Sequence, residues 1–259
     1  MDIEELERNW DEYGKADPLW SILALAEKKG NQWSIDEFFA TGQREIGAAL
    51  DWVTSLGARV LRRNALDFGC GVGRLTQALA DHFDRVCGVD MAPSMIELAN
   101  RYNRHPSRCK YYLNQRTDLK LFPGNTFDFV YAGLTLQHMQ PRYFKNYLRE
   151  FLAVLLPGGI AVFDLPSEHA NKLLARVLRV VPSVLANACR NLVLDAKHGS
   201  SPIMEMHWMK QEHVVRFVEQ HGGSVLDLRQ QSGAAPNWVV FQYCMTKASH
   251  GGRSEAHSL

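Results

Sequence analysis

The sequence lacks the usual features of a membrane, secreted or nucleic-acid-binding protein. No apolar run approaches the roughly 18 residues that would suggest a membrane span. Residues 1–7 are acidic rather than basic and apolar, so a secretory signal is not expected. Lys and Arg number 29 against 28 Asp and Glu, and this balance argues against nucleic-acid binding, which usually needs a basic field. These absences favour a cytoplasmic protein.

Paired cysteines are also missing. The chain has five cysteines, an odd number, with no spacing of the kind that zinc sites use. They are Cys70, Cys87, Cys109, Cys189 and Cys244. We therefore expect reduced thiols and no metal site.

From residue 64 onward, short apolar runs alternate with helical patterns, which is typical of a parallel sheet built from right-handed crossovers. The last two runs are close enough in sequence to form an antiparallel hairpin. The predicted strands are residues 65–68, 85–89, 110–113, 127–131, 160–165, 224–228 and 238–246. A chain of 259 residues can bury a sizeable core, and we expect one large α/β domain with appendages.

The first sixty residues have helical patterns and many aromatic side chains, which predicts a folded helical segment rather than a solvated tail. Ser34 and Glu37 form a capping-box pattern at the start of a short helix. Gly42 is expected to end that helix, and the apolar spacing over 46–56 predicts a second helix that lies against the sheet.

Residues 168–197 interrupt the alternation of strands and helices with an apolar stripe and a cationic stripe, which predicts an inserted pair of helices broken or kinked at Pro182. The cationic stripe is either the solvated face of a lid or a contact for a membrane surface or an anionic acceptor. Residues 248–259 contain few apolar side chains, so we expect a flexible tail.

A glycine-rich turn lies between the first predicted strand and the next helix. Gly69, Gly71 and Gly73 alternate with other residues, and bare backbone at such positions allows a ligand to approach closely. This spacing differs from the dinucleotide fingerprint, and Asp67, two residues ahead, does not suit a pyrophosphate. Asp90 ends the second strand, where a carboxylate takes both hydroxyls of a ribose. Two acids without a phosphate-binding lysine point to S-adenosylmethionine rather than a nicotinamide cofactor.

Four motifs then occur in sequence order: residues 66–73 (LDFGCGVG), 88–90 (GVD), 127–131 with 134–139 (FDFVY and LTLQHM), and 156–159 (LPGG). Together they resemble the class I, seven-stranded S-adenosylmethionine-dependent methyltransferases, of the bacterial small-molecule type. The resemblance implies a Rossmann-like, doubly wound α/β fold with a mostly parallel seven-stranded sheet and an antiparallel last strand. The expected domains are an N-terminal helical cap (1–60) and a methyltransferase domain (61–247) with a helical lid insertion (168–209).

The resemblance also implies which residues bind the cofactor, S-adenosyl-L-methionine, and its product S-adenosyl-L-homocysteine. They are Asp67, Gly69, Cys70, Gly71, Gly73, Arg74, Asp90, Met91, Thr117, Asp118 and Leu134. The glycines are expected beside the methionine and ribose, with Asp67 near the amino end. Met91 is expected beside the adenine and Leu134 beside the sulfonium. Arg116 stands where the family often places an acid, so Thr117 and Asp118 are alternatives for the adenine amine.

Methyl transfer is an in-line displacement, so the protein chiefly aligns the reactants and excludes water. A base is needed if the acceptor arrives protonated, and His138 and His207 are candidates because histidine titrates near neutral pH. The alternatives are a histidine that fixes the loop before Pro141 and a packed lid histidine, respectively. Asp164, at the end of the fifth strand, lies at the edge of the expected site or caps the next helix.

The sequence thus predicts an enzyme that methylates an oxygen or nitrogen of a small-molecule acceptor, such as a natural product or a sugar. The balanced charge and the enclosing extra segments favour a small acceptor over a protein or RNA. Two alternatives stay open: a non-catalytic S-adenosylmethionine-binding or scaffold protein, and a methyltransferase acting on a protein or RNA. Fold does not determine the acceptor.

Overall fold

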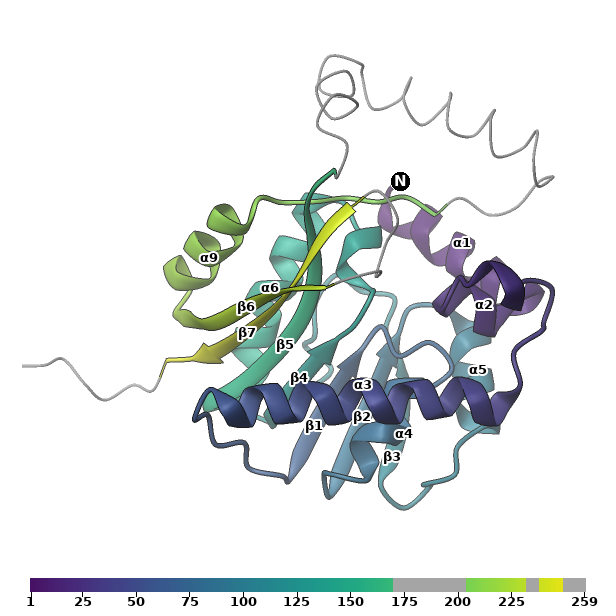
Figure 1. The fold of residues 1–259 in the computed structure, drawn as a ribbon, viewed down its shortest axis with the longest axis horizontal. Helices are drawn as coiled ribbons and strands as arrows, with labels where there is room; N and C mark the ends of the chain where they lie inside the picture. The colour runs from purple at the N-terminus through teal and green to yellow at the C-terminus, as the bar shows by residue number, and fades with distance from the viewer. Residues whose placement is uncertain (170–203, 232–237, 249–259) are drawn as a thin grey trace, which may run out of the picture.

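A computed structural model describes residues 1–169, 204–231 and 238–248 of the chain. Its centre is one seven-stranded sheet in the order β3-β2-β1-β4-β5-β7-β6 (Figure 1). The strands are β1 (Asn64–Phe68), β2 (Arg85–Asp90), β3 (Cys109–Leu113), β4 (Phe127–Ala132), β5 (Leu155–His169), β6 (Gly223–Gln231) and β7 (Trp238–Lys247). Strands β1 to β5 pair in parallel, and β7 is antiparallel to both β5 and β6. The predicted fold class is confirmed.

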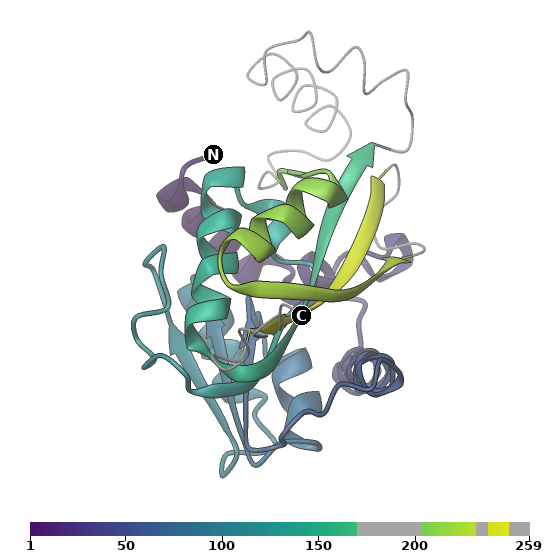
Figure 2. The same cartoon turned by 90° about the vertical axis from the view of Figure 1, so that its left-hand side faces the viewer.

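Helices cover both faces of this sheet, α3 and α4 on one side and α6 and α9 on the other (Figures 1 and 2). The helices are α1 (Ile3–Ala16), α2 (Pro18–Ile22), α3 (Ile35–Ser55), α4 (Arg74–Ala80), α5 (Pro93–Arg101), α6 (Pro141–Val154) and α9 (Gln211–Gln220), with short 3-10 turns at η1 (Ala26–Lys28) and η2 (Leu136–His138). None of the helices that the structure describes is long and apolar enough to cross a membrane.

Strand β4 explains how the two layers of core arise. All its residues are buried, as expected for a central strand of a parallel sheet. Because side chains alternate along a strand, Val130 packs in the cluster that includes α6, whereas Phe129 and Tyr131 pack in the cluster that includes α3 and α4. The chain then leaves β4 at its carboxyl end, where the site is built.

The expected break at Gly42 is wrong, because α3 is one continuous helix over Ile35–Ser55. Gly42 is needed for a different reason. A Cβ at this position would lie 2.5 Å from the carbonyl oxygen of Arg74, so the glycine allows α3 to cross the start of α4 at close range. The Ser34 hydroxyl accepts a hydrogen bond from the Glu37 amide at 3.2 Å, as the capping pattern predicts.

We expect Gly42→Ala to lower the free energy of unfolding by about 1–3 kcal/mol, because its methyl group must displace backbone rather than a flexible side chain. Gly47→Ala is the matched control, since nothing lies within 4 Å of a Cβ added there in the same helix. This control should stabilise the protein by about 1 kcal/mol through helix propensity. Urea unfolding followed by circular dichroism measures both. Similar effects of the two substitutions would contradict the close crossing.

Strand β5 continues to His169, so the predicted insertion cannot begin at residue 168. The part of β5 beyond the predicted strand 160–165 pairs with β7 as far as Trp238. Hydrogen bonds to β7 therefore extend β5 past its predicted end. The predicted helical pair falls largely within 170–203 and the predicted tail largely within 249–259, and both segments lie outside the described residues, as does Cys189.

Candidate functional site

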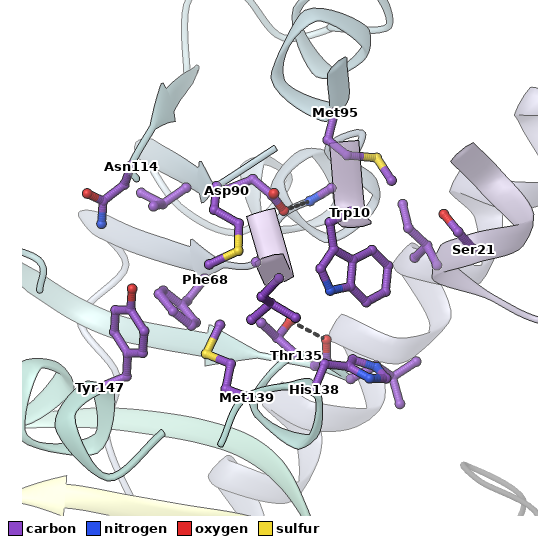
Figure 3. A pocket seen from close by; sticks show the side chains of 18 residues that line it. Trp10, Ser21, Phe68, Asp90, Met95, Asn114, Thr135, His138, Met139 and Tyr147 are labelled. Atoms are coloured by element: carbon purple, nitrogen blue, oxygen red, sulfur yellow. Dashed lines mark hydrogen bonds between the residues drawn. The ribbon is translucent and has the colours of Figure 1, made fainter. Parts of the chain in front are cut away.

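A pocket lies at the carboxyl ends of β1, β2 and β4, where the strand order reverses direction between β1 and β4. Such a switch point is where open α/β sheets bind ligands. The empty space at this point, counted together with the open solvent at its mouth, is about 730 Å³. Its walls are formed by Leu6, Trp10, Ser21, Ile22, Phe68, Gly69, Gly71, Val89, Asp90, Met91, Met95, Asn114, Gly133, Leu134, Thr135, His138, Met139 and Tyr147 (Figure 3).

The glycine turn forms one wall of this pocket, and its backbone requires glycine. The φ angles of Gly69, Gly71 and Gly73 are +72°, +51° and +87°, all in the left-handed region. Side chains of the protein also fill the space beside all three of them, with Tyr111 next to Gly73. A Cβ at Gly69 would overlap with Thr135, and one at Gly71 would lie 2.6 Å from the Ile22 side chain. The close approach at this turn is therefore made partly by the protein itself.

Asp90 lines the pocket and ties two of its walls together. One carboxylate oxygen accepts a hydrogen bond from the Gly71 amide, and the other accepts one from the Ala92 amide, both at 2.9 Å. Burial raises the pKa of Asp90 above its ordinary value, and the surrounding backbone N–H groups oppose the rise. Each carboxylate oxygen accepts two hydrogen bonds, so Asp90 retains acceptor capacity toward the pocket.

Asp67 is fully buried on the other side of the turn and does not line the pocket. Its Oδ2 accepts a hydrogen bond of 2.6 Å from the Thr76 hydroxyl. Its Oδ1 has no hydrogen-bond partner among the residues that the structure describes. Burial raises the pKa of Asp67 to about 7, and the Thr76 hydrogen bond and the charge of Arg74 act against it. Its predicted place near the amino end of the cofactor stays a prediction.

The other predicted cofactor residues divide into two groups. Met91 and Leu134 line the pocket, and Leu134 has a φ of +57°, in the left-handed region that a leucine rarely adopts. The residues outside the wall are Cys70, Gly73, Arg74, Thr117 and Asp118. Arg74 is itself buried and forms an ion pair of 2.7 Å with the partly exposed Glu45 of α3. The roles of both groups stay predictions.

Asn114 occupies the position at the end of β3 that the sequence leaves uncertain. It lines the pocket, whereas the two alternatives for the adenine amine do not. Its side chain donates to the Asp118 carbonyl at 2.8 Å and accepts from the Arg116 amide at 3.3 Å, so it holds the turn that follows. Its place directly after a predicted strand is the signal that would have found it.

The two candidate histidines both contact Glu205, but only His138 lines the pocket. His138 is buried and lines the pocket, and its Nδ1 lies 2.9 Å from the carbonyl oxygen of Glu205. His207 is not in the pocket wall; its amide donates to the Gln137 carbonyl at 2.7 Å, and its Nε2 lies 3.1 Å from Glu205 Oε2. The N-terminal ammonium of Met1 also pairs with Glu205 at 3.1 Å.

These contacts determine the tautomer of His138. A carbonyl oxygen can only accept, so Nδ1 carries the proton toward Glu205 and Nε2 is the basic nitrogen. The Gln137 side-chain nitrogen lies 3.3 Å from that Nε2. Burial tends to raise the pKa of Glu205, but hydrogen bonds from the N-terminus and His207 lower it overall, so the Glu205 side chain stays charged near His138. No cluster of His, Cys, Asp and Glu in the described part of the chain could hold a metal ion.

Comparisons with known proteins agree on one type of protein. A family model described as "Methyltransferase domain" matches residues 65–159. The ubiquinone biosynthesis O-methyltransferase of Albidiferax ferrireducens is 23% identical over 78% of this chain and 88% of its own length. The demethylmenaquinone methyltransferase of Bacillus licheniformis is 35% identical over 38% of this chain, and the match spans only 42% of that relative.

Solved structures agree on the fold. The magnesium protoporphyrin IX methyltransferase of Synechocystis PCC 6803 with bound SAH superposes with a TM-score of 0.64 at 14% identity, covering 95% of this chain and 100% of that one. A structure of the same protein has SAM bound. An S-adenosylmethionine-dependent methyltransferase from Clostridium acetobutylicum gives a TM-score of 0.58 at 15% identity, with 89% of this chain and 99% of that chain covered.

Proposed function

Because the chain is a class I S-adenosylmethionine-dependent methyltransferase, we propose that it methylates an oxygen or nitrogen of a small-molecule acceptor inside the pocket at the carboxyl ends of β1, β2 and β4. The observation that carries this proposal is the position of Asp90, between the glycine turn and the first turn of α5, with acceptor capacity toward the pocket. A ribose supplies the hydroxyl donors that such a carboxylate requires.

The remaining walls fit the other parts of the cofactor. When bound, S-adenosylmethionine supplies an activated methyl group on a sulfonium. Met91 and Phe68 offer apolar surface to an adenine ring, and the Asn114 side chain offers polar atoms at its edge. Leu134 and the glycine turn bound the side expected for the methionine part. The chain therefore holds the donor at the switch point and leaves the side near His138 for an acceptor.

His138 is proposed as the general base for an acceptor hydroxyl or ammonium. Its tautomer presents Nε2 as the proton acceptor, and Gln137 must release that nitrogen when an acceptor binds. Leu6 and Trp10 of α1 cover the pocket and exclude water from it. His207 is proposed to act behind His138 by orienting Glu205.

The small-molecule class of acceptor is supported by the relatives. Their names specify O-methylation in ubiquinone biosynthesis, methylation of demethylmenaquinone and methylation of magnesium protoporphyrin IX. The compounds named for these three relatives are all small molecules. The name of the ubiquinone biosynthesis enzyme favours oxygen as the methylated atom. The pocket is a concave site lined largely by apolar side chains of a single chain, which suits a small molecule better than an extended macromolecular surface.

The test is calorimetric titration of the full chain with S-adenosylhomocysteine. We expect Asp90→Asn to weaken binding by about 10- to 100-fold, because the change removes a charged acceptor from the ribose hydroxyls. The control is Asp84→Asn, which replaces an exposed carboxylate just before the opposite end of the same strand and should leave affinity unchanged. Unaltered binding by Asp90→Asn would place the cofactor elsewhere. Binding without turnover on any acceptor would instead support a non-catalytic protein.

A further inference from the structure

Helix α1 forms the roof of the pocket. Leu6 and Trp10, one helical turn apart, are the α1 residues that line it, and the Trp10 indole projects into it (Figure 3). The Trp10 ring packs edge-on against His138, with ring centroids 5.1 Å apart and an angle of 63° between the planes. The position of α1 therefore sets both the closure of the pocket and the packing around the proposed base.

A hydrogen-bonded latch joins α1 to the start of α5. Asp11, the residue after Trp10, accepts a hydrogen bond of 2.8 Å from the Ser94 amide. The Ser94 hydroxyl donates in return to the Asp11 carbonyl at 2.9 Å. Gly14, one turn further along α1, is buried against the same serine, because a Cβ there would overlap with the Ser94 hydroxyl. These contacts permit a close and specific crossing of the two helices.

This latch replaces a missing helix cap. The N-cap residue of α5 is Ala92, which has no side-chain acceptor for the first amides of the helix. Asp11 supplies a carboxylate to the Ser94 amide from another helix, and Asp90 supplies one to the Ala92 amide. A carboxylate is favourable at this end of a helix. The first turn of α5 thus anchors both the roof of the pocket and its ribose-binding wall.

We propose that Asp11 is a positioning residue that latches α1 over the pocket and so sets how long the cofactor stays bound. This inference rests on the proposed location of the cofactor. When the Asp11–Ser94 bond is lost, α1 lifts more often, Trp10 leaves the pocket, and the cofactor escapes through the opening. Loops and helices that close a site commonly govern ligand release in this way.

The experiment measures release of S-adenosylhomocysteine by stopped-flow displacement with excess S-adenosylmethionine. For Asp11→Ala we expect the dissociation rate to rise by about 5- to 30-fold, equivalent to the loss of a helix cap. Asp11→Asn retains an acceptor oxygen and should restore a rate close to that of the unaltered chain. Gly14→Ala provides a second variant, which should raise the rate by pushing α1 away from Ser94.

The control is Asp36→Ala, which removes an acidic residue from the first turn of α3 together with its 2.6 Å ion pair to Arg104. Neither Asp36 nor Arg104 lines the pocket. An unchanged dissociation rate in both Asp11→Ala and Gly14→Ala would overturn the proposal. An equal rise in Asp36→Ala would also overturn it, because general destabilisation would then explain the effect. Failure of the unaltered chain to bind S-adenosylhomocysteine would instead reject the proposed site, so the two failures are distinguishable.

Discussion

Replacement of His138 by glutamine is expected to lower kcat by about 100- to 10,000-fold, the range found when a general base is removed. Glutamine keeps a donor that can reach the Glu205 carbonyl, so the loop should stay in place while the basic nitrogen is lost. Cofactor affinity should change little, because Asp90 and the glycine turn remain intact. The measurement is steady-state kinetics with the acceptor at saturation, together with the dissociation constant of S-adenosylhomocysteine.

The pH profile separates this role from a purely structural one. With a histidine base, activity should fall as pH drops through the histidine range, and the glutamine variant should lose that dependence. His207→Gln is the matched control, because His207 contacts Glu205 without lining the pocket, and we expect a loss of less than about tenfold for such an indirect contact. Full activity of His138→Gln would show that the acceptor needs no base.

The sequence was sufficient for the fold because the relevant signals are local. Each parallel strand is a short apolar run, and the alternate glycines with Asp90 mark the two strand ends that meet at the switch point. Leu134, which the resemblance names because it lies just past the fourth strand, lines the pocket, and its role toward the cofactor stays a prediction. Such features depend on neighbouring residues in the chain, so a single sequence records them.

The roof of the pocket was not predictable by the same means. Trp10 looks like any core aromatic of a helical cap, and only the docking of α1 on α5 places it against His138. Gly42 was misread as a helix end for the same reason, since its partner, the Arg74 backbone, is 32 positions away in sequence. Contacts between distant segments leave no periodic pattern in the sequence.

Asp67→Asn is expected to remove a pH-dependent contribution of about 4 kcal/mol to the free energy of unfolding. In the folded chain, burial raises the pKa of Asp67 to about 7 from its ordinary value of 3.8. Between these two pH values the folded state keeps a proton that the unfolded state has lost. Stability due to Asp67 is therefore present at pH 4 and is lost as pH rises through 7.

Asparagine cannot titrate, and its side-chain oxygen can still accept the Thr76 hydrogen bond. The unaltered chain should consequently lose stability relative to Asp67→Asn as pH rises from 4 to 8. Urea denaturation at each pH measures both free energies of unfolding, and the value for Asp67→Asn minus that for the unaltered chain should rise. Asp84→Asn gives the baseline for replacing an exposed carboxyl group. A difference that stays flat with pH would mean that Asp67 is ionised in the folded chain, and its orphaned Oδ1 would then need a buried donor such as water.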